Sequence, residues 1–282
     1  MIVDQAEKLR LMVQDRQRRA QVIAVTSGKG GVGKTNIAAN LGLCLLAAKR
    51  EVIVIDADLG LANLDVILGM RSRLSLTQVI QGQRRLGEVI ESGPGGLKTV
   101  CGASGLTQLA DLSTFQREQL INDLSELENQ ADWIIIDTGA GISQSVLGFC
   151  EAADHTLVVT TPEPTSMTDA YAVIKALARG SSGTTLSLLA NRVSSRAEAK
   201  KVYQRLSQVS GQFLSMPIYD AGYVLEDEHL ALAVRRREPV VMAYPRCQAG
   251  FCMMALARKI GKLKETNREK TGFFKKVANW FF

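Results

Sequence analysis

The sequence predicts an α/β fold in which a doubly wound, mostly parallel sheet has helices on both faces. From Val22 onward, short β-branched apolar runs alternate with helical patterns along most of the 282 residues. Most of the runs are continuously apolar rather than alternating, as strands buried on both faces must be. The chain is 46% hydrophobic, which suffices for one large core.

The strands and helices follow one another in this alternation. Each predicted strand is a short apolar run, and together they span residues 22–26, 52–56, 97–101, 133–137, 156–160, 186–190 and about 218–224. Each predicted helix has apolar residues at helical spacing, and together they span 36–48, 113–129, 143–152, 166–178, 196–210 and 249–263. We expect one core domain over residues 21–263, between an N-terminal segment (1–20) and a C-terminal tail (264–282).

Composition and patterning exclude several classes of protein. No run of 18 or more uncharged apolar residues is present, which argues against a membrane-spanning helix. Charged residues interrupt segment 4–10, where a signal peptide needs an apolar core. The five cysteines include no CxxC pair, so neither a disulfide framework nor a zinc site is indicated. We therefore expect a reduced, cytoplasmic protein.

The net charge of +6 is concentrated at the two ends of the chain. Residues 1–20 contain five basic and three acidic side chains, and residues 258–282 contain eight basic and two acidic ones. Residues 21–257 therefore have a net charge of −2. Because a body that binds nucleic acid would carry a basic surface, we expect no direct contact with nucleic acid.

A glycine-rich loop follows the first predicted strand and matches the pattern GxxxxGK[ST] at residues 28–35. Backbone N–H groups of such a loop surround phosphate oxygens, and the following helix N-terminus adds its dipole. Lys34 is expected to reach the β- and γ-phosphates, and the Thr35 hydroxyl to bind Mg²⁺. The predicted nucleotide-binding residues of this region are Gly28, Lys29, Gly30, Gly31, Val32, Gly33, Lys34, Thr35 and Asn36.

The loop contains a second lysine, Lys29. An additional cation there is either a surface residue or a contact to phosphate, and its position would allow it to meet the nucleotide of a second subunit. Spacing alone leaves both interpretations open.

Three aspartates stand at the ends of predicted strands. Asp56 and Asp58 follow the second strand, and Asp137 follows the fourth. The carboxyl ends of parallel strands form the rim where ligands bind in such sheets. Asp137 suits the role of a Walker B aspartate, and one of the other two could orient the attacking water, since phosphoryl transfer depends mainly on positioning and charge. The alternative for Asp58 is that it only caps the next helix.

These motifs resemble those of the MinD/ParA group of P-loop ATPases, and most closely the FlhG (FleN/YlxH) family of flagellar-number regulators. Residues 27–35 resemble the lysine-bearing Walker A loop, and residues 56–65 resemble switch I of the MinD-like branch. Residues 137–143 are similar to switch II, and residues 162–171 and 4–10 are similar to segments typical of the FlhG family. The resemblance covers almost the whole chain.

The resemblance implies a homodimer that forms around ATP, with ATP and Mg²⁺ as cofactors. Lys29 would contact the nucleotide of the partner subunit, and Asp58 would orient the hydrolytic water. The implied catalytic residues are Asp58, Lys29 and Lys34, and the implied magnesium ligands are Thr35, Asp56 and Asp137. Further nucleotide contacts are implied for Asn191, Arg192, Leu225, Glu226 and Asp227. Leu225 departs from the family pattern, which usually has proline at this place.

The N-terminal segment 1–20 is open to two interpretations. Apolar residues at helical spacing among charges describe, by themselves, a solvated helix. By resemblance, the segment would be an activating helix that docks on the GTPase FlhF, and a glutamine that positions water suits that chemistry. The implied partner-binding residues are Asp4, Gln5, Ala6, Leu9 and Arg10.

The tail ends in an aromatic segment, 272–282, which follows the fully polar residues 264–271. At about 100° per residue the apolar side chains fill one arc of a helical wheel, and two lysines and an asparagine fill the other. This pattern predicts an interfacial membrane helix. The alternative is that the segment docks on the protein's own body, which would also serve as a resting state. The residues expected at the membrane are Phe273, Phe274, Lys275, Lys276, Val277, Trp280, Phe281 and Phe282.

The sequence therefore predicts a Mg²⁺-ATP-dependent switch that dimerises, hydrolyses ATP and attaches reversibly to the anionic inner face of the cell membrane. The resemblance implies a role in flagellar number or placement, with FlhF, components of the flagellar C-ring and a transcription activator as partners. One alternative is a MinD-type division-site regulator, but that function does not explain the presence of the segment 1–10. The other is a ParA-like DNA partition module, against which the charge of residues 21–257 argues.

Overall fold

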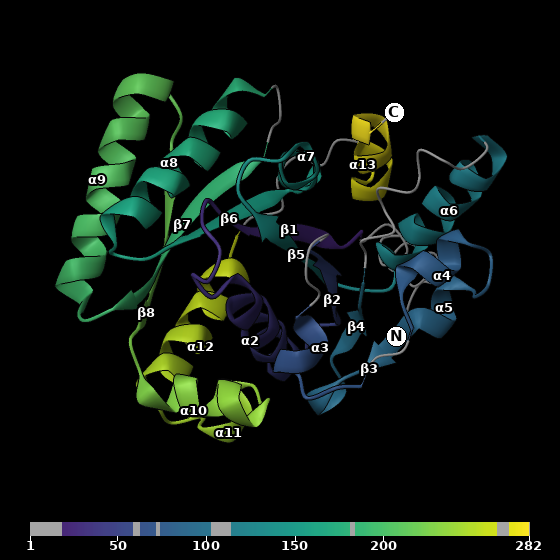
Figure 1. Ribbon diagram of the computed structural model, residues 1–282, viewed down its shortest axis with the longest axis horizontal. Coiled ribbons are helices and arrows are strands. Elements are labelled where there is room, and N and C mark those ends of the chain that lie inside the picture. The colour runs from purple at the N-terminus through teal and green to yellow at the C-terminus, as the bar shows by residue number, and fades with distance from the viewer. Residues whose placement is uncertain are drawn as a thin grey trace, which may run out of the picture.

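The computed structural model of the protein describes residues 19–58, 63–71, 74–102, 114–180, 184–263 and 271–281. An eight-stranded sheet forms its centre, and helices cover both faces (Figure 1). The strand order is β3-β4-β2-β5-β1-β6-β7-β8. All neighbouring strands pair in parallel except β3 and β4, which are antiparallel. The predicted fold class is confirmed.

The elements have the following bounds. The strands are β1 (Gln21–Ser27), β2 (Val52–Ala57), β3 (Ile90–Ser92), β4 (Lys98–Val100), β5 (Trp133–Ala140), β6 (His155–Thr160), β7 (Thr185–Val193) and β8 (Tyr219–Leu225). The longer helices are α2 (Lys34–Ala47), α6 (Thr114–Leu127), α7 (Gln144–Ala152), α8 (Pro164–Arg179), α9 (Arg196–Leu214), α10 (Glu228–Arg236), α12 (Gln248–Ile260) and α13 (Phe273–Phe281). The short ones are α3 (Leu64–Ile67), α4 (Leu76–Ile80), α5 (Leu86–Val89), α11 (Val240–Ala243) and the 3₁₀ turn η1 (Pro94–Gly96).

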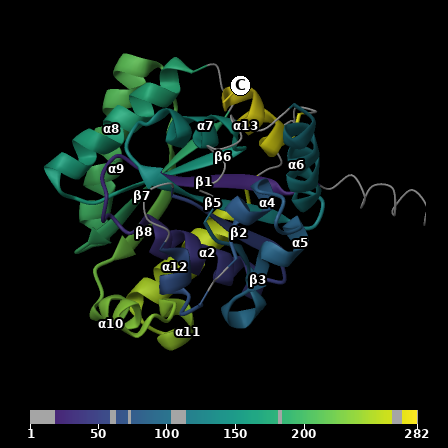
Figure 2. The same cartoon turned by 45° about the vertical axis from the view of Figure 1, so that its right-hand side comes forward.

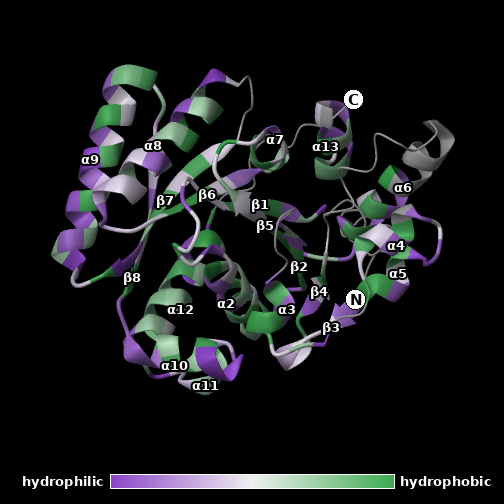
Figure 3. Ribbon diagram, in the orientation of Figure 1, coloured by the Kyte–Doolittle hydropathy of each residue, from purple (hydrophilic) through white to green (hydrophobic). Residues whose placement is uncertain are grey.

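The central strands are apolar throughout because both of their faces are covered. In β1, Val22 and Ala24 belong to the core on the side of α7, whereas Ile23 and Val25 belong to the core on the side of α2. Figure 3 shows the effect on the helices: α2, packed against the sheet, is largely green, whereas the outer helix α9 alternates between green and purple.

The edge of the sheet differs most from the prediction. Strand β3 and the short helices between residues 64 and 89 were not predicted, because each element is only three to five residues long. Such segments are too short to show a period of apolar residues.

The register of the central strands brings the predicted motifs together. Strand β5 lies between β1 and β2, and Asp56 of β2 pairs with Asp137 of β5. The glycine-rich loop leaves the same end of β1. The loop and both aspartates therefore meet at the carboxyl edge of the sheet, where ligands bind in open α/β folds.

Candidate functional site

The loop at residues 28–33 forms an open cradle between β1 and α2. Gly31 and Gly33 have φ values of 77° and 97°, a region that glycine enters without steric cost. Successive N–H groups in such a loop turn toward one side and attract anions. A Cβ atom at Gly31 would meet nothing within 4 Å, whereas one at Gly28 would collide with the backbone of Asp169. The loop is thus packed against α8 on one side and open on the other.

Lys34 begins α2 and is almost fully buried. Burial lowers the pKa of its ammonium group, while the negative charges of Asp137 and Asp58 act in the opposite direction. A desolvated lysine between carboxylates and an open cradle is suited to bind a phosphate oxygen.

Asp137 meets the requirements of a magnesium-binding carboxylate. Burial raises its pKa to about 7, against the effects of a hydrogen bond from Thr35 and the charge of Lys34. Its Oδ1 atom is buried and has no hydrogen-bond partner among the described residues. Mg²⁺ takes oxygen ligands and water, and it would compensate the cost of burying this charge. The Thr35 and Asp137 pair therefore fits the predicted metal.

Both carboxylate oxygens of Asp56, unlike those of Asp137, accept hydrogen bonds from backbone N–H groups. Its Oδ1 accepts the N–H of Asp58 at 3.1 Å, and its Oδ2 accepts those of Asn63 at 3.1 Å and Leu64 at 3.2 Å. Burial raises its pKa to about 6. Both carboxylate oxygens thus hold the backbone on the two sides of residues 59–62, and a direct contact to magnesium stays a prediction.

Asp58 lies just beyond β2 and faces the end of β5. A Cβ atom at Gly139 would be 3.4 Å from Oδ1 of Asp58. Helix α3 begins later, with Asn63 as its N-cap residue. Asp58 is therefore not the N-cap of the next helix, and its carboxylate lies beside the segment that resembles switch II.

Lys29 forms its contacts within its own chain. Its Nζ atom lies 3.0 Å from Oε2 of Glu163 and 3.3 Å from Oγ1 of Thr165. The side chains of both ion-pair partners are well exposed, at 43% and 61%. Such a pair contributes about 0–1 kcal/mol, so Lys29 can exchange Glu163 for another anion at little cost.

A cavity of about 400 Å³ adjoins the loop and contains the other predicted nucleotide contacts. Asn191 is 2% exposed, its Nδ2 donates to the carbonyl of Val32 at 2.7 Å, and its Oδ1 accepts the N–H of Arg192 at 2.9 Å. Asn191 thus braces the loop, and its contact to a base stays a prediction. The lining combines Gly33, Asn36, Asn191, Arg192, Leu225, Glu226 and Asp227 from the predicted set.

Asp227 has a structural role in this cavity wall. It is the N-cap residue of α10 and accepts the N–H groups of His229 and Ala249, both at 2.9 Å. Although burial opposes the effect, these hydrogen bonds hold its pKa at about 2. Sequence reasoning missed the apolar part of the lining, which comes from α2 and α10: Ile37, Leu230, Ala231 and Val234. The signal that could have found it is the amphipathic pattern of residues 228–236.

Helix α13 docks on the body of the protein. It lies beside α6 and α7 (Figure 2), and Phe273, Phe274 and Val277 are 1–3% exposed. The indole Nε1 of Trp280 donates to the carbonyl of Gln144 at 3.1 Å, and a Cβ atom at Gly148 would collide with this indole. These three apolar side chains are thus covered by protein, as in the docked alternative, while Lys275 remains exposed.

One buried carboxylate joins the docked helix to the start of the sheet. Glu128 is 2% exposed, accepts the N–H of Phe274 at 3.1 Å and forms an ion pair with Arg19. Arg19 also donates from Nη1 to the carbonyl of Thr271 at 2.9 Å. Burial raises the pKa of Glu128, and the Arg19 charge acts against this shift.

Several predicted residues lie outside the described part of the chain. These are the N-terminal set Asp4, Gln5, Ala6, Leu9 and Arg10, together with Phe282 and the side chain of Phe281. Within the described residues, no helix is both long and apolar enough to cross a bilayer.

The burial of Asp137 predicts a pH dependence of stability. Because its pKa is about 7 in the folded chain, the folded state retains a proton above about pH 4 that the unfolded state has released. Without nucleotide, this group therefore makes the free energy of unfolding fall as the pH rises toward 7. Asp137→Asn removes the titrating group. The free energy of unfolding of the variant, relative to that of the wild type, should therefore rise by a few kcal/mol between about pH 5 and about pH 7.5. Urea denaturation measures the two free energies of unfolding. A difference between variant and wild type that does not change with pH would contradict the prediction.

Comparisons with known proteins agree with this geometry. The family model of the CobQ/CobB/MinD/ParA nucleotide-binding domain matches residues 23–240. The chain is 42% identical over 240 residues to the antiactivator FleN of Pseudomonas aeruginosa, covering 85% of this chain and 86% of FleN. It is 37% identical over 225 residues to the flagellum site-determining protein YlxH of Helicobacter pylori, covering 79% of this chain and 76% of YlxH.

Solved structures share the fold. The septum site-determining protein MinD from Pyrococcus horikoshii, complexed with Mg-ADP, superposes with a TM-score of 0.69 at 23% identity, covering 86% of this chain and 97% of that one. A chain of the MinC:MinD cell division protein complex from Aquifex aeolicus gives a TM-score of 0.66 at 27% identity, covering 89% of this chain and 99% of that one.

Proposed function

Because the chain belongs to the CobQ/CobB/MinD/ParA family of nucleotide-binding domains, we propose that it is a Mg²⁺-dependent ATPase switch that dimerises around ATP. The observation that carries this proposal is the composition of the carboxyl edge of the sheet. An open phosphate cradle, a buried lysine, a metal-compatible Asp137 and an exchangeable Lys29 lie together there.

Each residue has a distinct task in this proposal. The loop N–H groups and Lys34 bind the phosphates, and Thr35 and Asp137 hold the metal. The bound Mg²⁺ neutralises negative charge on the phosphates. Asp58 orients the attacking water, and Lys29 leaves Glu163 to contact the phosphates bound by the second subunit. Catalysis then rests on positioning and charge stabilisation.

Lys29→Ala tests the dimer. We expect the wild type to form dimers with ATP but not with ADP, and the variant to remain monomeric with either nucleotide. Its ATP turnover should fall at least about tenfold, since removing a charge contact to the transition state costs more than 1.4 kcal/mol. Light scattering and phosphate release measure the two effects. Lys175→Ala, an exposed lysine on α8, is the control. If the Lys29→Ala variant dimerised with ATP and hydrolysed ATP at the wild-type rate, the proposal would be contradicted.

Membrane attachment would use α13 after its release. Since the docked helix hides Phe273, Phe274 and Val277, one apolar face cannot contact the body and a bilayer together. We propose that ATP-dependent dimerisation favours the released form. Two released helices on one dimer would bind an anionic surface far better than one, because the second binds at high effective concentration. The protein would then be cytoplasmic and peripheral at the inner face of the cell membrane.

The cellular role proposed is control of flagellar number or placement, supported by the similarity to FleN and YlxH. The partners would be FlhF, flagellar C-ring components and a transcription activator, with residues 1–20 stimulating FlhF. A peptide of residues 1–20 should raise the rate of GTP hydrolysis by FlhF. No stimulation would favour a MinD-type division role, which the 30% identity to MinD of Bacillus subtilis also allows.

A further inference from the structure

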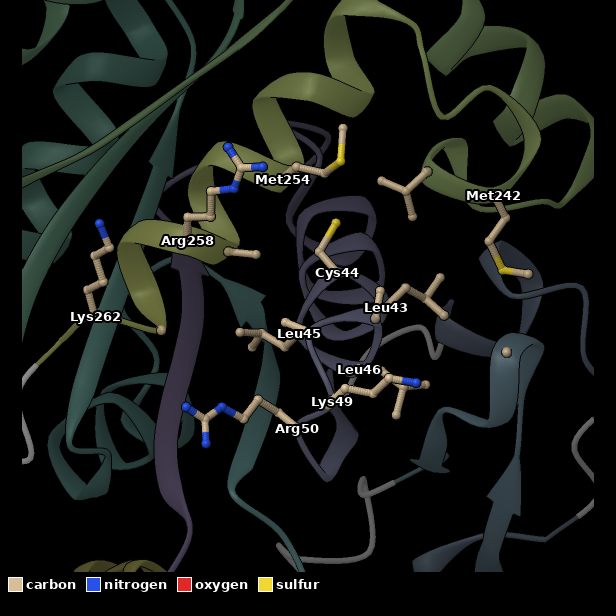
Figure 4. Close-up of a pocket in the computed structure, with 16 residues that line it drawn as sticks. Leu43, Cys44, Leu45, Leu46, Lys49, Arg50, Met242, Met254, Arg258 and Lys262 are labelled. Atoms are coloured by element: carbon tan, nitrogen blue, oxygen red, sulfur yellow. The ribbon is translucent and has the colours of Figure 1, made fainter.

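A second hollow lies at the opposite end of α2 from the phosphate cradle. It has a volume of about 800 Å³ and is bounded by the C-terminal halves of α2 and α12, by α11 and by Gly95 of η1 (Figure 4). Its floor is apolar, with Leu43, Leu46 and Met254 among the lining residues. None of the residues proposed for nucleotide binding lines it.

Four cations line the same hollow, and no acidic residue among those that the structure describes does so. They are Lys49, Arg50, Arg258 and Lys262, all of which are exposed. Within the described part of the chain, none of the four forms an ion pair. As far as the described residues show, the hollow therefore presents positive charge that has no ion-pair partner beside an apolar surface.

Positively charged and apolar side chains alternate around the hollow. In Figure 4, Arg258 lies next to Met254, one turn away on α12, and Lys49 lies next to Leu46. Cations at helix C-termini also stabilise helix dipoles, which accounts for Arg258 in the last turn of α12. Helix dipoles do not account for the apolar residues of the lining.

We propose that this hollow binds a single-chain anionic amphiphile, with a carboxylate or phosphate head between the cations and an acyl tail along the leucines and methionines. The volume lies within the 300–1,000 Å³ that is usual for small-molecule sites. An unbranched acyl chain can follow an apolar hollow of this size, and methionines adapt readily to it.

The hollow also lies away from the docked helix α13. Helices α2 and α12 pack with Ile23 and Val25 of β1, whereas α13 packs in the core that contains Val22 and Ala24. The hollow and the docked helix thus lie on opposite faces of the sheet.

Calorimetric titration of the full-length chain with oleate, below its critical micelle concentration, tests the site. We expect one saturable site with a dissociation constant on the order of micromolar, and no binding of the neutral analogue monoolein. The double variant Arg258→Glu/Lys262→Glu should bind oleate at least about tenfold more weakly. Oleoyl lysophosphatidate, tested in parallel, distinguishes a phosphate head from a carboxylate head.

A matched control separates site binding from general charge. Arg196→Glu/Lys200→Glu makes the same charge change on exposed residues of α9 and should leave oleate binding unchanged. The proposal is overturned if oleate binding is non-saturable, or if both double variants lose it equally. It is also overturned if phosphatidylglycerol vesicles, but not oleate, bind in a manner that depends on Arg258 and Lys262.

Discussion

Glu128→Ala is expected to detach α13 from the body and to raise the binding of the nucleotide-free chain to anionic vesicles at least about tenfold. The carboxylate of Glu128 holds the first turn of α13 through the N–H of Phe274, and its ion pair places Arg19 against the carbonyl of Thr271. Breaking a buried pair by removing one partner costs about 3–5 kcal/mol. About 1.4 kcal/mol of that loss, if it falls on the docked helix, gives the tenfold change.

Vesicle flotation with phosphatidylglycerol measures this release, in the absence of nucleotide and with ADP. Glu126→Ala is the matched control, because Glu126 is exposed in the last turn of α6, two residues before Glu128. Glu128→Gln should give an intermediate result, since its amide oxygen still accepts a hydrogen bond but carries no charge. Phe274→Glu added to Glu128→Ala should abolish the new binding if the released helix is what reaches the membrane. Vesicle binding of Glu128→Ala equal to that of the wild type would refute the docking role of this carboxylate.

Asp58→Ala is expected to lower ATP turnover at least about 100-fold while leaving ATP binding and dimer formation intact. The reason is positional: Asp58 lies beside Gly139 and near the buried Lys34, but it is not the N-cap of α3. Since hydrolysis would end the life of the dimer, the variant dimer should also dissociate more slowly. Lys34→Ala should differ, because a lost phosphate contact weakens ATP binding itself.

Single-turnover hydrolysis and dimer dissociation, followed on the same samples, distinguish these effects. Glu91→Ala is the control, because it removes a carboxylate from the edge strand β3, three strands from β5. Its rates of hydrolysis and dimer dissociation should equal those of the wild type. If ATP turnover by Asp58→Ala equalled that of the wild type, the water would have to be oriented by another group, and the role proposed for Asp58 would be wrong.

Most of the fold could be predicted from local pattern. Seven of the eight strands that the structure describes lie where a strand is predicted, and most of them are continuous apolar runs, as strands buried on both faces must be. The glycine-rich loop and the aspartates at strand ends can likewise be predicted to lie together, because parallel strands bring their carboxyl ends to one edge of the sheet. Strand β3 could not be predicted, since its three residues, Ile-Glu-Ser, carry no pattern.

Contacts between distant residues could not be predicted in the same way. The sequence does not tell that Asn191 binds the carbonyl of Val32, that Lys29 meets Glu163, or that both oxygens of Asp56 are used by backbone. These pairs lie far apart along the chain or depend on the turn of a loop. Among the buried carboxylates of the described residues, Asp137 alone has an oxygen atom with no hydrogen-bond partner, which distinguishes it from Asp56.

The sequence by itself determined the α/β class, the phosphate loop and the existence of an amphipathic helix at residues 273–281. Only the tertiary structure decided what covers that helix. A helical period defines an apolar face, but the free energy of removing that face from water is nearly the same for a lipid surface and for a protein groove of equal area. The choice was made by shape and charge: Gly148 leaves room for Trp280, and Glu128 holds the start of the helix.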